Sequence, residues 1–142
     1  MTEAQAREQP DFLGNAQASG FVLPRYIPKP WGHEEWIVVT DKYVMKRLVV
    51  RKGESLSKQY HRQKMETLVV AKGSCWLLLG QEGDLTLENA QKHLFREGEA
   101  VHLNPNTIHT FEAIENLMLF EVSTPELDDV VRLEDRYGRI IS

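Results

Sequence analysis

Three residues that can bind a metal ion occur at short spacing in this chain of 142 residues, and a fourth follows some forty positions later. Gln59 and His61 are two positions apart, so both side chains leave the same face of an extended strand. Glu66 follows a predicted turn at 62–64 that returns its carboxylate to the pair, and His109 begins a later strand that can complete the set. Two imidazoles, one carboxylate and one amide oxygen suit a divalent cation that keeps open coordination positions. The spacing therefore predicts a metal site held by these four residues.

Turn-forming residues surround the predicted ligands. Gly53 and Gly73 bracket the first segment, and Gly98 opens a second one that passes through the turn 104–106 before His109. Any one of the ligands alone would be interpreted as an ordinary surface or core polar group. Their combination with two similarly punctuated segments favours the metal site.

Short runs of strand-forming residues, separated by turn signals, dominate the chain from about residue 35. Many short strands at close spacing favour a closed antiparallel barrel or jelly roll, which leaves no exposed sheet edge. Three prolines between residues 23 and 31 exclude a helix there and favour an extended lead-in. The expected strands are 35–40, 43–51, 56–61, 67–72, 74–79, 84–87, 91–94, 100–103, 109–113 and 117–122.

The two ends of the chain differ from this β-rich part. Residues 1–20 are polar, without a sustained apolar period, and we expect them to form a flexible arm before a single domain over 21–142. Thr124 and Pro125, followed by acidic residues, resemble a helix start, and the helix would run to about Tyr137. The predicted fold class is therefore all-β, a small barrel with a short C-terminal helix.

Composition excludes several classes of partner. The formal net charge is -4 and comes without a basic stripe, which disfavours nucleic acid. No apolar stretch is long enough to span a bilayer, and the N-terminus lacks the hydrophobic core of a signal peptide, so no membrane partner is expected. The single cysteine, Cys75, lies within an apolar run and indicates a buried thiol in a reducing compartment. We therefore expect a cytoplasmic protein.

Two groups of residues resemble the paired motifs of the cupin superfamily, whose fold is a small double-stranded β-helix barrel with a metal in its mouth. The segment 56–61 is similar to the type II mannose-6-phosphate isomerases, where Gln takes the first ligand place. Segments 29–32 and 128–139 are similar to the entry motif and the C-terminal signature of that group, in whose larger members the cupin follows a sugar-nucleotide transferase domain. The residues carrying the superfamily resemblance are Gly53, Gln59, His61, Glu66, Gly73, Gly98 and His109.

The resemblance implies a metal-dependent sugar-phosphate isomerase that interconverts mannose 6-phosphate and fructose 6-phosphate. Its cofactor would be one divalent ion (Zn, Mn, Co, Ni or Fe), its partner a sugar phosphate, and its assembly a homodimer. Lys46 and Lys64 are the candidate catalytic residues for proton transfer, and Arg139, at the end of the tail motif, is the candidate contact to the phosphate. The alternative for each of the three is an ordinary surface role.

Around Glu66 the sequence differs from the isomerase group, and these differences leave two other functions possible. Bifunctional relatives have Arg, Ala, Glu and His where this chain has Lys64, Met65, Glu66 and Thr67, so an imidazole has become a hydroxyl. A non-catalytic sugar-binding cupin would explain that loss. Two histidines and one carboxylate with open positions also fit an Fe(II)-dependent cupin dioxygenase.

Overall fold

The computed structural model describes residues 14–140, which form eleven strands and one short 3₁₀ helix. Every strand pair in this range is antiparallel. In chain order the elements are β1 (Arg25–Lys29), β2 (Gly32–Val39), β3 (Val44–Val50), β4 (Lys58–Tyr60), β5 (Glu66–Lys72), β6 (Ser74–Leu79), η1 (Leu87–Asn89), β7 (Gln91–Arg96), β8 (Ala100–Leu103), β9 (His109–Ala113), β10 (Leu117–Ser123) and β11 (Val131–Glu134).

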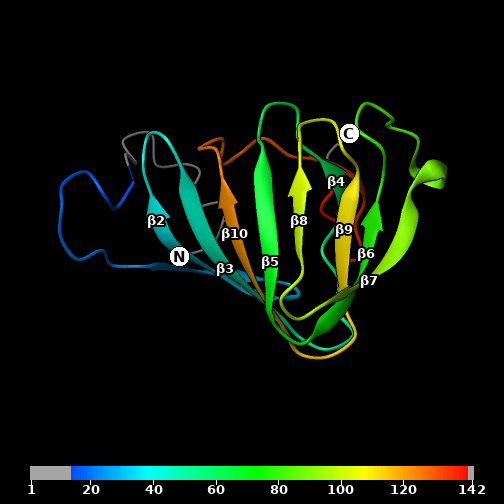
Figure 1. Cartoon of the computed structure of the whole chain (residues 1–142), viewed down its shortest axis with the longest axis horizontal. Coiled ribbons are helices and arrows are strands. Elements are labelled where there is room, and N and C mark those ends of the chain that lie inside the picture. The colour runs from blue at the N-terminus through cyan, green and yellow to red at the C-terminus, as the bar shows by residue number, and fades with distance from the viewer. Residues whose placement is uncertain (1–13, 141–142) are drawn as a thin grey trace.

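The strands form two sheets that enclose one interior. The first has the order β1-β2-β3-β10-β5-β8 and the second the order β11-β4-β9-β6-β7. Figure 1 shows the first sheet on the left and in the centre and the second on the right, with the strands converging toward the bottom of the view. The predicted all-β fold is therefore confirmed.

Strand alternation divides the interior into an apolar end and a polar end. In β3 the buried positions are Val44, Lys46, Leu48 and Val50, so one lysine enters an otherwise apolar row. In β5 the buried row begins at Glu66, and in β10 it includes Glu121, which pairs in register with Lys46. The main core lies beyond these charges and includes Trp31, Leu48, Leu68, Phe111 and Leu119. The barrel therefore presents its buried charged groups near one end.

Two predicted elements are wrong. The C-terminal helix is absent from the described residues, because Val131 and Arg132 pair with Tyr60 and Gln59 and build β11 onto the edge of β4. This pairing across the fold overrides the local helix-start signal. The strand expected at 84–87 is also absent, because the Asp84 carboxylate accepts a hydrogen bond from the Thr86 N–H and forms a turn that leads into η1.

The N-terminal part follows the expectation of an extended lead-in, and it contains β1, paired with β2. Of the predicted flexible arm, residues 1–13 lie outside the described residues. Within its remainder, the side chain of Asn15 accepts a hydrogen bond from the Val39 N–H and donates to the Ile37 carbonyl. No helix in residues 14–140 is long and apolar enough to cross a membrane.

Candidate metal centre and its pocket

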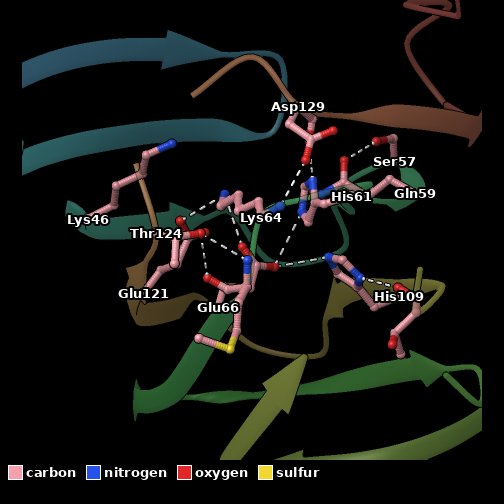
Figure 2. Close-up of polar contacts among 12 residues, drawn as sticks. Lys46, Ser57, Gln59, His61, Lys64, Glu66, His109, Glu121, Thr124 and Asp129 are labelled. Carbon is pink, nitrogen blue, oxygen red and sulfur yellow. Dashed lines mark hydrogen bonds and ion pairs between the residues drawn. The ribbon is translucent and has the colours of Figure 1, made fainter. Parts of the chain in front are cut away.

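Three of the four predicted ligands meet inside the barrel. His61 directly follows β4, Glu66 opens β5 and His109 opens β9, and all three side chains are buried. Their possible ligand atoms lie within 4.8 Å of one another. The Glu66 Oε1 atom lies 3.1 Å from Nε2 of His109 and 3.5 Å from Nε2 of His61. Figure 2 shows Glu66 between the two imidazoles.

Backbone carbonyls fix which nitrogen each imidazole offers. The Nδ1 atom of His109 lies 2.9 Å from the Thr107 carbonyl, and that of His61 contacts the Asp129 carbonyl. A carbonyl only accepts, so each Nδ1 donates its proton there, and Nε2 is the nitrogen of each ring that faces Glu66. Both Nε2 atoms are buried without a hydrogen bond of good geometry to any residue in 14–140. This is the arrangement of metal-binding histidines, so His61, Glu66 and His109 fit a divalent ion.

Gln59 lies on the pocket wall next to this cluster. Its Oε1 atom accepts a hydrogen bond of 2.7 Å from the Ser57 hydroxyl. The amide oxygen therefore faces Ser57 here, and its place as a fourth ligand stays a prediction.

Lys64 is buried between two carboxylates. Its Nζ atom lies 3.0 Å from Oε2 of Glu66 and 3.1 Å from Oε2 of Glu121. Burial alone would lower the pKa of Lys64, but Glu121 and Glu66 raise it above its ordinary value. Burial would likewise raise the pKa of Glu66, but Lys64 and the two imidazoles hold it well below the ordinary range. Lys64 is therefore a buried ammonium and not a surface lysine.

A second buried ion cluster lies on β1, β2 and β3. Glu34 accepts a hydrogen bond of 2.9 Å from the Trp36 indole and lies 3.3 Å from Nζ of Lys46 and 3.7 Å from Nζ of Lys29. Burial would raise the pKa of Glu34, but Lys46 and Lys29 hold it well below its usual range. Lys46 also sits 4.9 Å from the centroid of the Trp36 ring. These contacts fix the second candidate lysine inside the barrel.

A pocket connects the two clusters and carries more positive than negative side chains. Arg139 lies on its wall, and its Nε and Nη2 atoms bind the Asp135 carboxylate at 2.8 and 3.1 Å. This pairing fixes the direction of the guanidinium. The basic residues of the lining are Lys29, Lys46, Lys64, Arg132 and Arg139, and the acidic residues are Glu34, Glu121 and Asp129.

The sequence analysis missed Glu34, Glu121 and Asp129 as site residues. The register of β10 could have indicated Glu121, because it lies two and four positions from the buried Leu119 and Leu117. Asp129 carried no such signal, since an acid after Thr124 and Pro125 is typical of the first turn of a helix.

Comparisons with known proteins agree with this fold. The model of the family described as "Mannose-6-phosphate isomerase C-terminal" matches residues 22–135. An RmlC-like cupin from Shewanella frigidimarina superposes with a TM-score of 0.61 at 10% identity, covering 78% of this chain and 95% of that one. This likeness shows the fold and confirms the predicted cupin barrel.

Two curated relatives are guanylyltransferases by name. Mannose-1-phosphate guanylyltransferase ManC of Salmonella typhimurium is 35% identical over 123 residues, which are 83% of this chain and 24% of that protein. Mannose-1-phosphate guanylyltransferase of Escherichia coli is 36% identical over 121 residues, which are 82% of this chain and 23% of that protein. The chain thus spans about a quarter of the length of these relatives.

These names correct the predicted activity. The expected function was an aldose–ketose isomerase acting on mannose 6-phosphate, with Lys46 and Lys64 as its proton-transfer groups. The relatives are nucleotidyltransferases by name, so the isomerase prediction is wrong. The names do place the family in carbohydrate metabolism.

Proposed function

The chain belongs to the family described as the mannose-6-phosphate isomerase C-terminal domain, and from that premise we propose that it is a metal-binding cupin domain whose pocket binds a phosphorylated mannose. The observation that carries the proposal is the pocket, which reaches the ligand cluster at His61 and whose lining is richer in lysine and arginine than in acids. We choose mannose as the sugar of the proposed ligand because the names of the relatives refer to mannose 1-phosphate.

Charge favours a phosphate ester over a neutral sugar in this pocket. Two neutral imidazoles and one carboxylate around a divalent ion leave a net charge of about +1, which attracts an anion. The basic side chains of the lining add to this field, and a partly closed site weakens the attraction less than open water does.

Each polar group of the pocket has a distinct role in this proposal. Arg139, oriented by Asp135, is the planar donor for the phosphate oxygens. Lys46, held by Glu34, supplies a second positive charge inside the barrel. His61, Glu66 and His109 would hold the metal, which when bound would act as a Lewis acid toward sugar oxygens.

The test is calorimetric titration of the Co(II)-loaded chain with mannose 1-phosphate, mannose 6-phosphate and mannose. We expect the phosphate esters to bind at least about tenfold more tightly than mannose, because hydrogen bonds to charged groups contribute about 1.5–3 kcal/mol. Arg139→Gln should weaken binding of the esters about ten- to a hundredfold.

Arg96→Gln is the matched control, because Arg96 is an exposed residue of β7 that pairs with Glu99 outside the pocket. It should leave the affinity for the esters unchanged. Equal affinities for mannose and its phosphates, or an equal loss in both arginine variants, would refute the proposed ligand.

The homodimer implied by the resemblance also stays a prediction. Phe21 and Leu23, just before β1, are almost fully exposed, and Tyr26 on β1 is exposed as well. β1 forms the outer edge of its sheet. These residues offer apolar surface to a second copy of the chain.

A further inference from the structure

The C-terminal tail, residues 124–139, packs along the segment that carries the first metal ligand. Thr124 accepts a hydrogen bond from the Met65 N–H at 3.0 Å, and β11 pairs with β4. Farther along, the Tyr137 hydroxyl accepts a bond from the Ser55 N–H. The tail therefore follows the chain from residue 55 to residue 65.

Asp129 is the point at which this tail reaches the metal centre. Its carboxylate accepts the N–H groups of Arg62, Gln63 and Lys64 at 3.0, 2.6 and 2.8 Å. Its own carbonyl accepts the Nδ1–H of His61. One residue of the tail thus holds both the ring of a ligand and residues 62–64 of the turn that leads from His61 to Glu66. Figure 2 shows Asp129 next to His61.

We propose that Asp129 is a positioning residue that sets the affinity of the centre for its metal ion. The proposal rests on the metal site of the proposed function. The outer partner of a metal-binding histidine fixes the direction of its free nitrogen, and removing such partners typically reduces metal affinity about ten- to a hundredfold.

The surrounding contacts explain why this turn depends on the tail. On the barrel side, β4 pairs with β9 through a single residue pair, Gln59 and His109. The Asn106 N–H donates to the His61 carbonyl at 2.7 Å, which anchors the backbone and leaves the ring direction to Asp129. Three backbone donors outweigh the effect of burial and lower the pKa of the Asp129 carboxyl, so it is an acceptor at neutral pH.

This geometry couples metal binding to docking of the tail in both directions. If docking of the tail orients His61 for the metal, then the metal stabilises docking of the tail by the same factor. The tail is therefore part of the metal centre, although it contributes no ligand to the cluster.

The test uses the full chain and Co(II) alone. Its affinity is measured by competition with a chromophoric chelator, and its ligand field by visible absorption. Asp129→Asn keeps the main-chain carbonyl that contacts His61, but its amide nitrogen cannot accept the backbone N–H that faced the lost oxygen. The turn and that carbonyl should therefore shift, which should lower the affinity about tenfold and alter the absorption spectrum. Asp135→Asn is the matched control: it removes the same charge and three hydrogen bonds from the same tail, but these bonds go to Arg139.

Hydrogen exchange of the unsubstituted chain provides a second measurement that needs no variant. Co(II) should slow exchange at residues 62–64 and 131–134. The inference would be overturned if Co(II) left the exchange rates of the tail unchanged, or if Asp129→Asn bound Co(II) within twofold of the original affinity. It would also be overturned if Asp135→Asn lost as much Co(II) affinity as Asp129→Asn. Failure of the unsubstituted chain to bind Co(II) would overturn the proposed function as well, whereas normal binding by Asp129→Asn would overturn the positioning role alone.

Discussion

At the scale of single residues, Glu34 is a buried charge with three polar partners. It is 8% exposed and contacts two ammonium groups and an indole N–H. A buried carboxylate is tolerated only when such partners compensate its loss of water. Removing the charge leaves Lys46, itself 6% exposed, without its counter-ion.

Glu34→Gln should therefore destabilise the protein at pH 7 by about 3–5 kcal/mol, the usual effect of breaking a buried ion pair. The folded pKa of Glu34 lies well below its unfolded value of about 4.5, so its contribution is complete above pH 4.5 and is lost as the pH falls toward the folded pKa. The stability difference between the original chain and the variant should shrink from pH 5 to pH 3. Denaturant titrations at several pH values measure it.

Glu35→Gln is the matched control for this prediction. Glu35 is the next residue of β2 and pairs with Arg47, but the side chains are 28% and 36% exposed. Solvent screens such a pair, so Glu35→Gln should lower the free energy of unfolding much less than Glu34→Gln does. A Glu34→Gln chain as stable as the original at pH 7 would contradict the assigned role of Glu34.

At the scale of elements, the tight turn from β5 in the first sheet to β6 in the second depends on Gly73. This residue has a φ of +85°, and a Cβ atom there would lie 2.3 Å from the backbone oxygen of Asn116. Gly83 has a φ of +86°, but a Cβ atom there would meet nothing within 4 Å. The two glycines therefore share the left-handed conformation and differ in the space around them.

Gly73→Ala should destabilise the chain more than Gly83→Ala does. The left-handed conformation costs an alanine about 1–2 kcal/mol at either position. At Gly73 the clash adds to this cost, because the opposing atom belongs to the backbone and cannot rotate away. Urea unfolding of both variants separates the conformational cost from the cost of the clash. Equal losses of stability in the two variants would show that the loop around Asn116 moves freely.

The same scale shows why some elements follow from the sequence and others do not. Alternation and glycine turns predict β5, β6, β8 and β9, because their signals are local. The turn residue Asn106 adopts a φ of 62°, the left-handed conformation that asparagine tolerates. β11 has no such signal, since its conformation depends on the open edge of β4, about seventy residues earlier in the chain.

The candidate site divides in the same way. His61 and Glu66 have a spacing that a strand end and a turn convert into proximity, and His109 joins them where β9 pairs with β4. Glu34 and Asp129 reach the pocket through long-range pairing, which sequence spacing does not encode, whereas the alternation along β10 could have indicated Glu121 as an inward-facing residue. The activity could not be predicted either, because ligand residues on a barrel do not specify one reaction.

At the scale of the whole molecule, the metal centre joins the two sheets. His61 and His109 come from the second sheet, and Glu66 comes from the first. The three ligands therefore converge only when both sheets are packed together. An ion bound here is bound by the folded state and not by the unfolded chain.

Metal loading should consequently raise the global stability. When free metal is about a hundred times its dissociation constant, the free energy of unfolding should increase by about 2.7 kcal/mol. Denaturant titration of the Co(II)-loaded and chelator-treated chain measures the increase. His109→Ala should abolish it, while His93→Ala, at an exposed position of β7, should retain it. An increase that survives in His109→Ala would place the stabilising ion elsewhere, because without His109 the second sheet keeps only His61 to meet Glu66 across the interior.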